Sequence, residues 1–189
     1  MNGQRGLSLI ELMVAITIGL IIVLGAAMMI LPINQTTTST TRASRMNTDA
    51  RAMLDLFTNE LQRAGYQSPA ADNPYIRIQE DGNCIVYGYA ENPGSAVLWH
   101  AFRFNANTRQ MQAVYNRGTP PAACSAAGLP WMSLTESNAL PLRSDGFSAQ
   151  CPSPGNILRI QLRFEPQDGN SLPDQTLEIQ PRNTTCTAS

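Results

Sequence analysis

The sequence predicts an α+β protein in which a long N-terminal helix packs on an antiparallel β-sheet domain. Three observations support this fold class. One uninterrupted apolar run lies near the N-terminus, a stretch with helical periodicity follows it, and the remainder alternates with a period of two between turn-rich segments. We therefore divide the chain into four segments: residues 1–6, 7–31, 32–66 and 67–189.

The apolar run extends from Leu7 to Leu31 and follows the short polar segment 1–6. As a helix it would be about 37 Å long, which is enough to cross the ~30 Å hydrocarbon core of a bilayer. It is longer than the roughly 7–15 apolar residues of a secretory signal, and the small residue Gly6 precedes the run, whereas a signal cleavage site follows it. Arg5, the one charge before the run, favours an N-terminus on the cytoplasmic side.

Glu11 interrupts the apolar run one turn after its start. A carboxylate at bilayer depth costs about 2.5–3.5 kcal/mol, so such a residue usually has a partner or a function. Glu11 also lies close to the end of the run, where a charged side chain can reach the interface at little cost. Position alone leaves both interpretations open.

Helical periodicity continues in residues 32–66. Pro32 removes a helical hydrogen bond, so the helix bends or briefly breaks there, and the polar segment 34–41 is a poor helix former. Gly65, with Pro69 beyond it, gives a helix stop. Between these points apolar residues recur at three- and four-residue steps and predict a stripe that packs on a sheet: Ala43, Met46, Ala50, Met53, Leu54, Phe57, Leu61 and Ala64.

The remainder of the chain reads as strands and turns. The clearest strand is 156–165, in which alternate residues are apolar, and residues 117–155 show little regularity. Short turn-forming segments separate the earlier strands and favour an antiparallel meander. The other predicted strands are 75–79, 84–91, 96–105, 109–116 and 175–181.

Four cysteines, Cys84, Cys124, Cys151 and Cys186, all follow the apolar run. An even number in a domain exported to an oxidising compartment predicts two disulfides, with buried free thiols as the alternative. Three pairings are possible, and the sequence does not choose among them. We favour Cys84–Cys124, which would tie the irregular loop 118–130 to the meander, and Cys151–Cys186, which would hold the C-terminal tail.

The composition argues against an enzyme and against a nucleic-acid-binding protein. The chain has 13 Arg and no Lys against 14 acidic residues, so its charge is near balance, and Schiff-base and P-loop chemistry are excluded. One histidine and four separated cysteines do not form a zinc pattern, and we expect no metal or cofactor. We interpret His100 as a packed sheet residue, and Asp168-Gly169-Asn170 with Asp174 as a turn rather than a calcium loop.

The motif Gly6-Leu7-Ser8-Leu9-Ile10-Glu11 resembles the processing site of type IV prepilins and type II secretion pseudopilins. In that family a prepilin peptidase cuts after the glycine and methylates the new N-terminus, which the resemblance implies for Gly6 and Leu7. Glu11 would then be the fifth residue, the position of the family's glutamate. Because a lone amine and a lone carboxylate are both costly in apolar surroundings, the resemblance implies that Glu11 pairs with a neighbouring subunit's N-terminus.

Two further segments, 54–66 (LDLFTNELQRAGY) and 178–183 (EIQPRN), resemble PilW-type minor pilins. That resemblance implies a single-pass protein of the bacterial inner membrane with its globular domain in the periplasm. Its partners would be prepilin peptidase, other minor pilins and the major pilin. It would prime pilus assembly and end at the pilus tip on the cell surface.

Two other functions remain open from the sequence. A J-type pseudopilin of type II secretion, or a competence pseudopilin for DNA uptake, would carry the same N-terminal motif. A membrane-anchored adhesive domain that never polymerises would need exposed aromatic residues. The candidates are Trp99, Trp131, Tyr87 and Tyr89, although aromatic residues in strands usually belong to the core.

Overall fold

The protein is described by a computed structural model. It covers residues 8–68, 75–135, 140, 142–152, 156–165 and 173–188, with the side chains of 29–39 excepted. The expected leader 1–6, Leu7 and the Asp168-Gly169-Asn170 segment lie outside the described residues. The chain forms two compact units, Met1–Ser44 and Arg45–Ser189.

Helix α1 (Leu9–Gln62) begins in the first unit and ends in the second. It is assigned without interruption across Pro32 and across the polar segment 34–41, where the sequence suggested a break and a weak helix. Helix propensity is a weak prior, and a proline removes one hydrogen bond without ending a helix that continues on both sides. Of the two alternatives at Pro32, a brief break is excluded, and the one long helix predicted from its apolar and amphipathic parts is confirmed.

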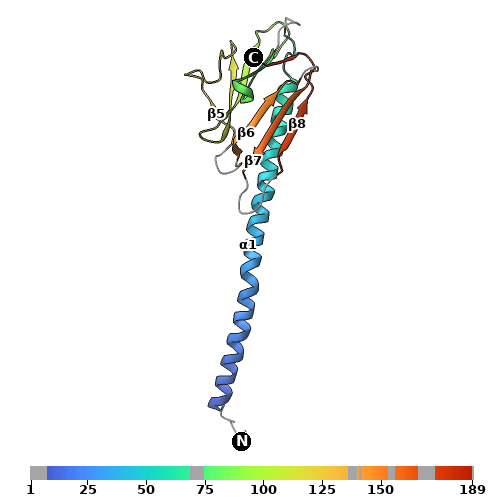
Figure 1. Ribbon diagram of the computed structural model, residues 1–189. Coiled ribbons are helices and arrows are strands. Elements are labelled where there is room, and N and C mark those ends of the chain that lie inside the picture. The colour runs from blue at the N-terminus through green and yellow to red at the C-terminus, as the bar shows by residue number, and fades with distance from the viewer. Residues whose placement is uncertain are drawn as a thin grey trace. The chain divides into compact units, whose positions relative to one another are not determined.

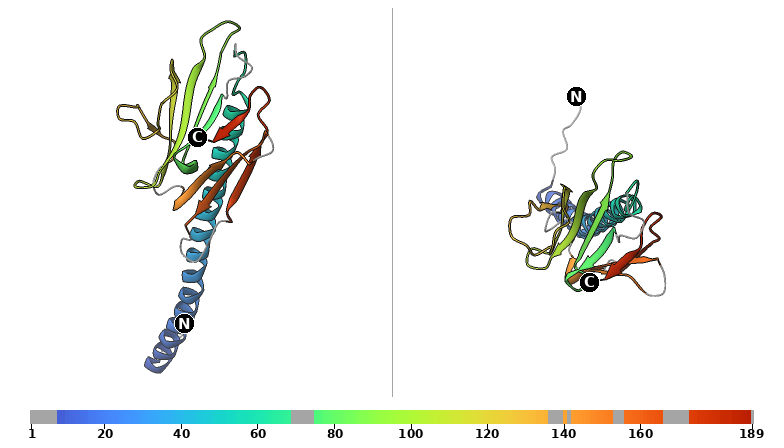
Figure 2. Two further views of the ribbon diagram at one scale, coloured as in Figure 1. Left: turned by 45° about the horizontal axis from the view of Figure 1, so that its top comes forward. Right: turned by 90° about the horizontal axis from the view of Figure 1, so that it is seen from above.

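The second unit contains two sheets, which lie next to the teal end of α1 in Figures 1 and 2. Sheet A has the strand order β5-β4-β3-β2-β1-β9, and sheet B has the order β6-β7-β8. Sheet A consists of β1 (Ile76–Gln79), β2 (Cys84–Tyr89), β3 (Leu98–Asn105), β4 (Gln110–Arg117), β5 (Met132–Ser133) and β9 (Cys186–Ala188). Sheet B consists of β6 (Leu142–Gln150), β7 (Leu158–Phe164) and β8 (Gln175–Ile179).

The strand pairing confirms the antiparallel meander β1–β2–β3–β4. A single 3₁₀ turn (Glu80–Gly82) joins β1 to β2. The sequence did not reveal β5, β6 or β9, and β9 pairs with β1 in parallel, which is the one departure from antiparallel order among the described strands. Strand β9 is only three residues long and follows a proline-containing turn, so its two-residue period is too short to detect.

The apolar stripe of α1 forms the centre of the core. Phe57 and Leu61 are fully buried. The Phe57 ring lies 4.9 Å from the ring of Phe102 in sheet A and 6.0 Å from the ring of Phe147 in sheet B, measured between centroids. The predicted packing of the stripe on a sheet is confirmed, and the structure adds that this one helical residue contacts both sheets. Truncating such a phenylalanine to alanine typically costs about 3–5 kcal/mol.

The opposite face of sheet A has a smaller apolar cluster, which includes Cys84, Val86 and Trp99. The Cys84–Cys124 disulfide holds the irregular loop that follows β4 against this face. Gly88 is required here, because a Cβ at this position would lie only 2.9 Å from the Trp99 indole. The loop 118–130, in which the sequence shows no periodicity, therefore covers the apolar cluster on this face of sheet A.

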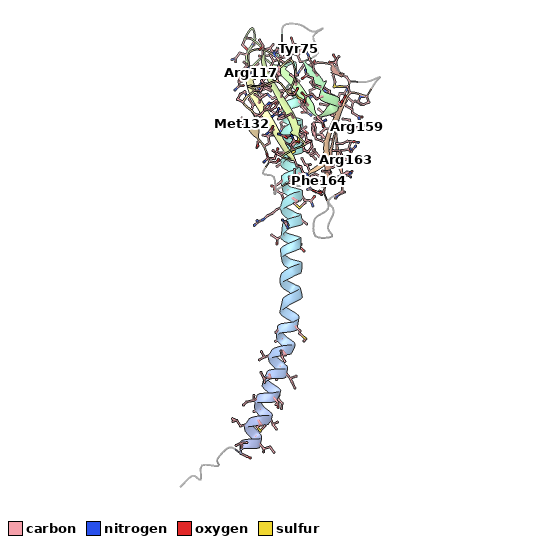
Figure 3. The ribbon with its side chains drawn as sticks, turned by 60° about the vertical axis from the view of Figure 1, so that its left-hand side comes forward. Tyr75, Arg117, Met132, Arg159, Arg163 and Phe164 are labelled. Atoms are coloured by element: carbon pink, nitrogen blue, oxygen red, sulfur yellow. A yellow bond between two sulfur atoms is a disulfide. The ribbon has the colours of Figure 1, made fainter. Side chains whose placement is uncertain are left out.

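The Cys151–Cys186 disulfide joins the end of sheet B to the edge strand β9 of sheet A. Its Cα atoms are 5.8 Å apart. On the outer face of sheet B, Arg159 pairs with Glu178 at 2.8 Å and Arg163 with Asp145 at 3.1 Å, and Figure 3 labels both arginines. Because exposed ion pairs contribute only about 0–1 kcal/mol, the disulfide is the stronger link at this end of the domain.

The two segments that resemble PilW-type pilins meet where α1 ends. Gly65 has a positive φ of 75°, and a Cβ there would lie 2.5 Å from the carbonyl oxygen of Asn183. The Gly65 amide donates to the Gly88 carbonyl at 2.8 Å, and the Tyr75 amide donates to the Thr184 hydroxyl at 2.8 Å. The C-terminal segment therefore crosses the helix end at a distance that only glycine allows.

Gly65→Ala should destabilise the domain by roughly 2–4 kcal/mol, because it combines a left-handed backbone with a clash against Asn183. Gly94→Ala is the matched control: Gly94 has a φ of 78°, but a Cβ added there would have no atom within 4 Å, so only the backbone cost of about 1 kcal/mol should appear. Denaturant unfolding of both variants measures the difference, and equal losses would show that the contact with Asn183 contributes nothing.

Replacing Cys151 and Cys186 together by serine should lower the free energy of unfolding by roughly 3–4 kcal/mol, since the bridge closes a loop with a sequence separation of 35 residues. Chemical denaturation of the wild type and the double variant measures this loss. Serine variants of Cys84 and Cys124, with a separation of 40 residues, provide the comparison. A loss below about 1 kcal/mol would contradict the stabilising role of the bridge between the two sheets.

Candidate functional site

The first candidate site is the exposed apolar part of α1. Residues Leu9–Met28 have a mean hydropathy of 2.6, and none of this stretch is buried within the protein. Leu9 is 76% exposed and Ile21 is 69% exposed. Apolar side chains exposed along such a length mark a surface that lipid or other helices cover. A secretory signal would satisfy the same test of length and composition, so the residues around Glu11 must distinguish the two.

The helix start places Glu11 in the first turn of α1. The Ser8 carbonyl accepts hydrogen bonds from the Glu11 amide at 3.0 Å and from the Leu12 amide at 3.2 Å, so Ser8 occupies the N-cap position. Ser8 and Glu11 have the spacing of a capping box, and the positive end of the helix dipole favours a carboxylate in this turn. The glutamate therefore suits this helix start locally as well as through the processing motif.

Glu11 is the one charged residue between Leu9 and Met28. Its side chain is exposed, and none of the described side chains forms an ion pair with it. Thr17, the other polar residue of the stretch, satisfies its hydroxyl by donating to the Val14 carbonyl at 2.9 Å. In apolar surroundings a lone carboxylate such as that of Glu11 is costly unless a cation pairs with it. Gly6 and Leu7, the expected processing residues, lie outside the described part of the chain.

The aromatic residues considered for adhesion are mostly part of the core. Tyr87 is fully buried, and Tyr89 and Trp99 are each 6% exposed. Trp131 is half buried beneath the Arg103 guanidinium, which lies 4.1 Å from the ring centroid. These four side chains therefore do not form an open binding surface.

A cluster of titratable residues on the helix-facing side of sheet A was not found from the sequence. The Tyr87 hydroxyl donates to Glu60 at 3.1 Å, and Arg63 lies over the Tyr89 ring at 4.3 Å. Burial, followed by the Glu60 charge, raises the pKa of Tyr87 well above its usual value. Burial and the Arg63 charge lower the pKa of His100 to about 4. The alternation of Tyr87 and Tyr89 hinted at one shared face, but only the fold brings Glu60 and His100 to it.

One recess of about 340 Å³ lies beside α1 in the second unit. Its lining is largely apolar, and Asp49 is its charged residue. The residues that line the recess include Asp49, Ala52, Met53, Leu56, Leu134 and Leu140.

Among the described residues there is no group of histidine, cysteine or carboxylate side chains that could hold a metal ion.

Comparison with known families agrees with the site at the N-terminus. Residues 1–27 match the prokaryotic N-terminal methylation motif, which contains Gly6, Leu7 and Glu11. Residues 39–181, more than half of the chain, match the family described as prepilin peptidase-dependent protein B. No curated protein and no solved structure matches the chain significantly. The chain therefore belongs to the prepilin peptidase-dependent protein B family and is a type IV pilin-like protein.

Proposed function

We propose that this protein is a minor type IV pilin that primes pilus assembly in a complex with other minor pilins. The observation that carries the proposal is the wholly exposed apolar helix Leu9–Met28, which holds a single charge, Glu11, and begins within a matched N-terminal methylation motif. The domain that follows belongs to a pilin-like family and is held together by two disulfides.

Processing is the first step of the proposed mechanism. Prepilin peptidase cuts after Gly6 and methylates the amine of Leu7, while the apolar helix stays on the protein. The helix then anchors the subunit in the inner membrane, with the disulfide-bonded domain in the periplasm. Disulfides persist in that oxidising compartment, which agrees with the pairing of all four cysteines.

Docking is the second step. A carboxylate at bilayer depth costs about 2.5–3.5 kcal/mol, so an unpaired Glu11 is a penalty for the isolated subunit. The N-terminal amine of a neighbouring subunit carries the opposite charge in the same apolar surroundings. When two helices pack in the correct register, the ion pair removes both penalties, and a wrong register leaves them in place. Glu11 therefore selects the register of assembly, while the apolar faces supply most of the contact.

The globular domain then supplies lateral contacts to other minor pilins and to the major pilin. A complex of minor pilins that starts a pilus remains at its outer end, so the proposed final location is the pilus tip. A J-type pseudopilin would use the same helix and the same glutamate in type II secretion. Parallel assays of piliation, secretion and transformation distinguish these machines.

The intact mass of the membrane-extracted protein should show loss of residues 1–6 and gain of one methyl group, but only in cells that have prepilin peptidase. The reason is that the expected cleavage site precedes the apolar run. Reduction should add four hydrogens, two for each disulfide. Gly6→Val, which places a bulky side chain at the cleavage site, should retain the leader. A leader retained in wild-type cells, or cleavage after Met28, would overturn the pilin assignment.

Glu11→Gln should leave the protein processed and membrane-bound but weaken its association with partner pilins by roughly 10- to 100-fold, equivalent to about 1.4–2.8 kcal/mol. Co-purification from membranes, together with surface pili counted by microscopy, measures the effect. Thr17→Val is the matched control, because the Thr17 hydroxyl bonds within its own helix. Secretion and transformation are assayed in the same strains. Normal piliation with lost secretion in the Glu11→Gln strain would assign the protein to a pseudopilus. Normal co-purification, piliation, secretion and transformation would show that Glu11 has no part in the mechanism.

A further inference from the structure

His100 is the single histidine of the chain and lies on β3. Aromatic rings from the neighbouring strands enclose it. It is 1% exposed. The rings of Tyr87 and Tyr89 stack on it, with centroid distances of 5.1 and 4.6 Å and interplanar angles of 20° and 11°. Tyr115 meets it edge-on at 5.7 Å. Water therefore has little access to the imidazole.

The hydrogen bonding of His100 specifies its neutral form. The Asn116 amide donates to Nδ1 at 3.4 Å, so Nδ1 is an acceptor and the proton of the neutral ring is on Nε2. Nε2 is buried and has no hydrogen-bond partner in the described part of the chain. Protonation would turn Nδ1 into a donor that faces the Asn116 donor. The one hydrogen bond of the ring would then be lost.

His100 also lies opposite an irregularity in sheet A. Trp99 pairs with Arg117 and Ala101 pairs with Val114, so two residues of β4, Tyr115 and Asn116, face His100 alone. Asn116 has a positive φ of 56°. Such a bulge interrupts the ladder of backbone hydrogen bonds. The Asn116 amide donates to the His100 side chain instead of to a backbone carbonyl of β3.

The charged groups around His100 also oppose its protonation. Arg63, which directly follows α1, lies over the Tyr89 ring that stacks on His100. Glu60 on α1 accepts a hydrogen bond from the Tyr87 hydroxyl at 3.1 Å and lies 3.8 Å from Arg63. The other titratable groups that face the imidazole are the phenols of Tyr87 and Tyr89 on β2 and of Tyr115 on β4. Phenols are neutral at about pH 5–7.5, and burial raises the pKa of each of these three further. A protonated His100 would therefore meet Arg63 without a free carboxylate.

We propose that His100 is an acid-sensitive latch that holds the β3–β4 bulge and the end of α1 together while it is neutral, and that proton uptake below about pH 6 favours local opening there. The latch depends on the fold of the second unit and not on the pilus assignment. It would make the end of the domain that carries Gly65 respond to the acidity of the medium.

The direction of the effect follows from the pKa values. The folded pKa of His100, about 4, lies below the value of about 6.5 expected for an exposed histidine, so the closed state is fully favoured above pH 6.5 and loses this advantage as the pH falls toward 4. At pH 5.0 the opening equilibrium constant should rise roughly 30-fold relative to pH 7.5.

Amide hydrogen exchange on the full chain in detergent tests this expectation at pH 7.5 and 5.0, after correction for the intrinsic pH dependence of exchange. The readout is protection at Tyr115, Asn116 and residues 57–65. His100→Phe keeps an aromatic ring but cannot titrate, so its opening constant should change less than about threefold between the two pH values. A 30-fold change that persists in His100→Phe would overturn the proposal.

Imidazole NMR gives a second readout, because the chain has one histidine and its titration is observed without overlap. The wild-type midpoint should lie near 4, and Arg63→Gln should raise it and reduce the pH effect on opening. Arg51→Gln, at an exposed arginine on α1, is the matched control and should change neither. A folded-state midpoint near 6.5 would overturn the latch even if His100→Phe did not fold.

Discussion

The packing of the Phe57–Leu61 stripe of α1 on both sheets is the contact on which the rest of the domain depends. Sheet A and sheet B share no strand, and the helix core and the Cys151–Cys186 bridge are the main links between them among the described residues. Without the helix each sheet would expose an apolar face that it cannot cover alone. The helix therefore contributes to the core against both sheets. Its end, near Gly65, determines where the C-terminal segment can pass over it.

That helix serves two different environments along its length. Its N-terminal part, Leu9–Met28, is apolar on every side, as expected of a segment that lipid or other helices surround. Its C-terminal part is amphipathic, with Met53 and Phe57 buried and Asp55 exposed. The change in pattern along one continuous helix leaves the apolar part open to lipid or other helices, while the amphipathic part carries a folded domain.

The polar groups follow the same division. In the apolar part Glu11 is a single costly charge, and in the proposed function it selects the docking partner. In the domain, Glu60 and Arg63 lie at the end of the helix beside buried tyrosines and His100, where the surroundings keep the imidazole neutral. Both sites use the same principle: a charge in poorly hydrated surroundings is tolerated only with a correctly placed partner. In the proposed function the first site selects between subunits, and in the proposed acid response the second selects between states of one domain.

The sequence by itself determined the apolar helix, its carboxylate at Glu11, the stripe through Phe57 and the strands of the meander. These features are local: each depends on composition or on a period of a few residues. Only the tertiary structure decided the pairing of Cys84 with Cys124, the parallel strand β9, the contact of Gly65 with Asn183, and the enclosure of His100. Each of these joins residues far apart in the chain, and no local pattern specifies which distant segments meet. The cysteine pairs favoured from the sequence are the ones the structure contains, but the reason, a cover for the second face of sheet A and a bridge between the sheets, is visible only in the fold.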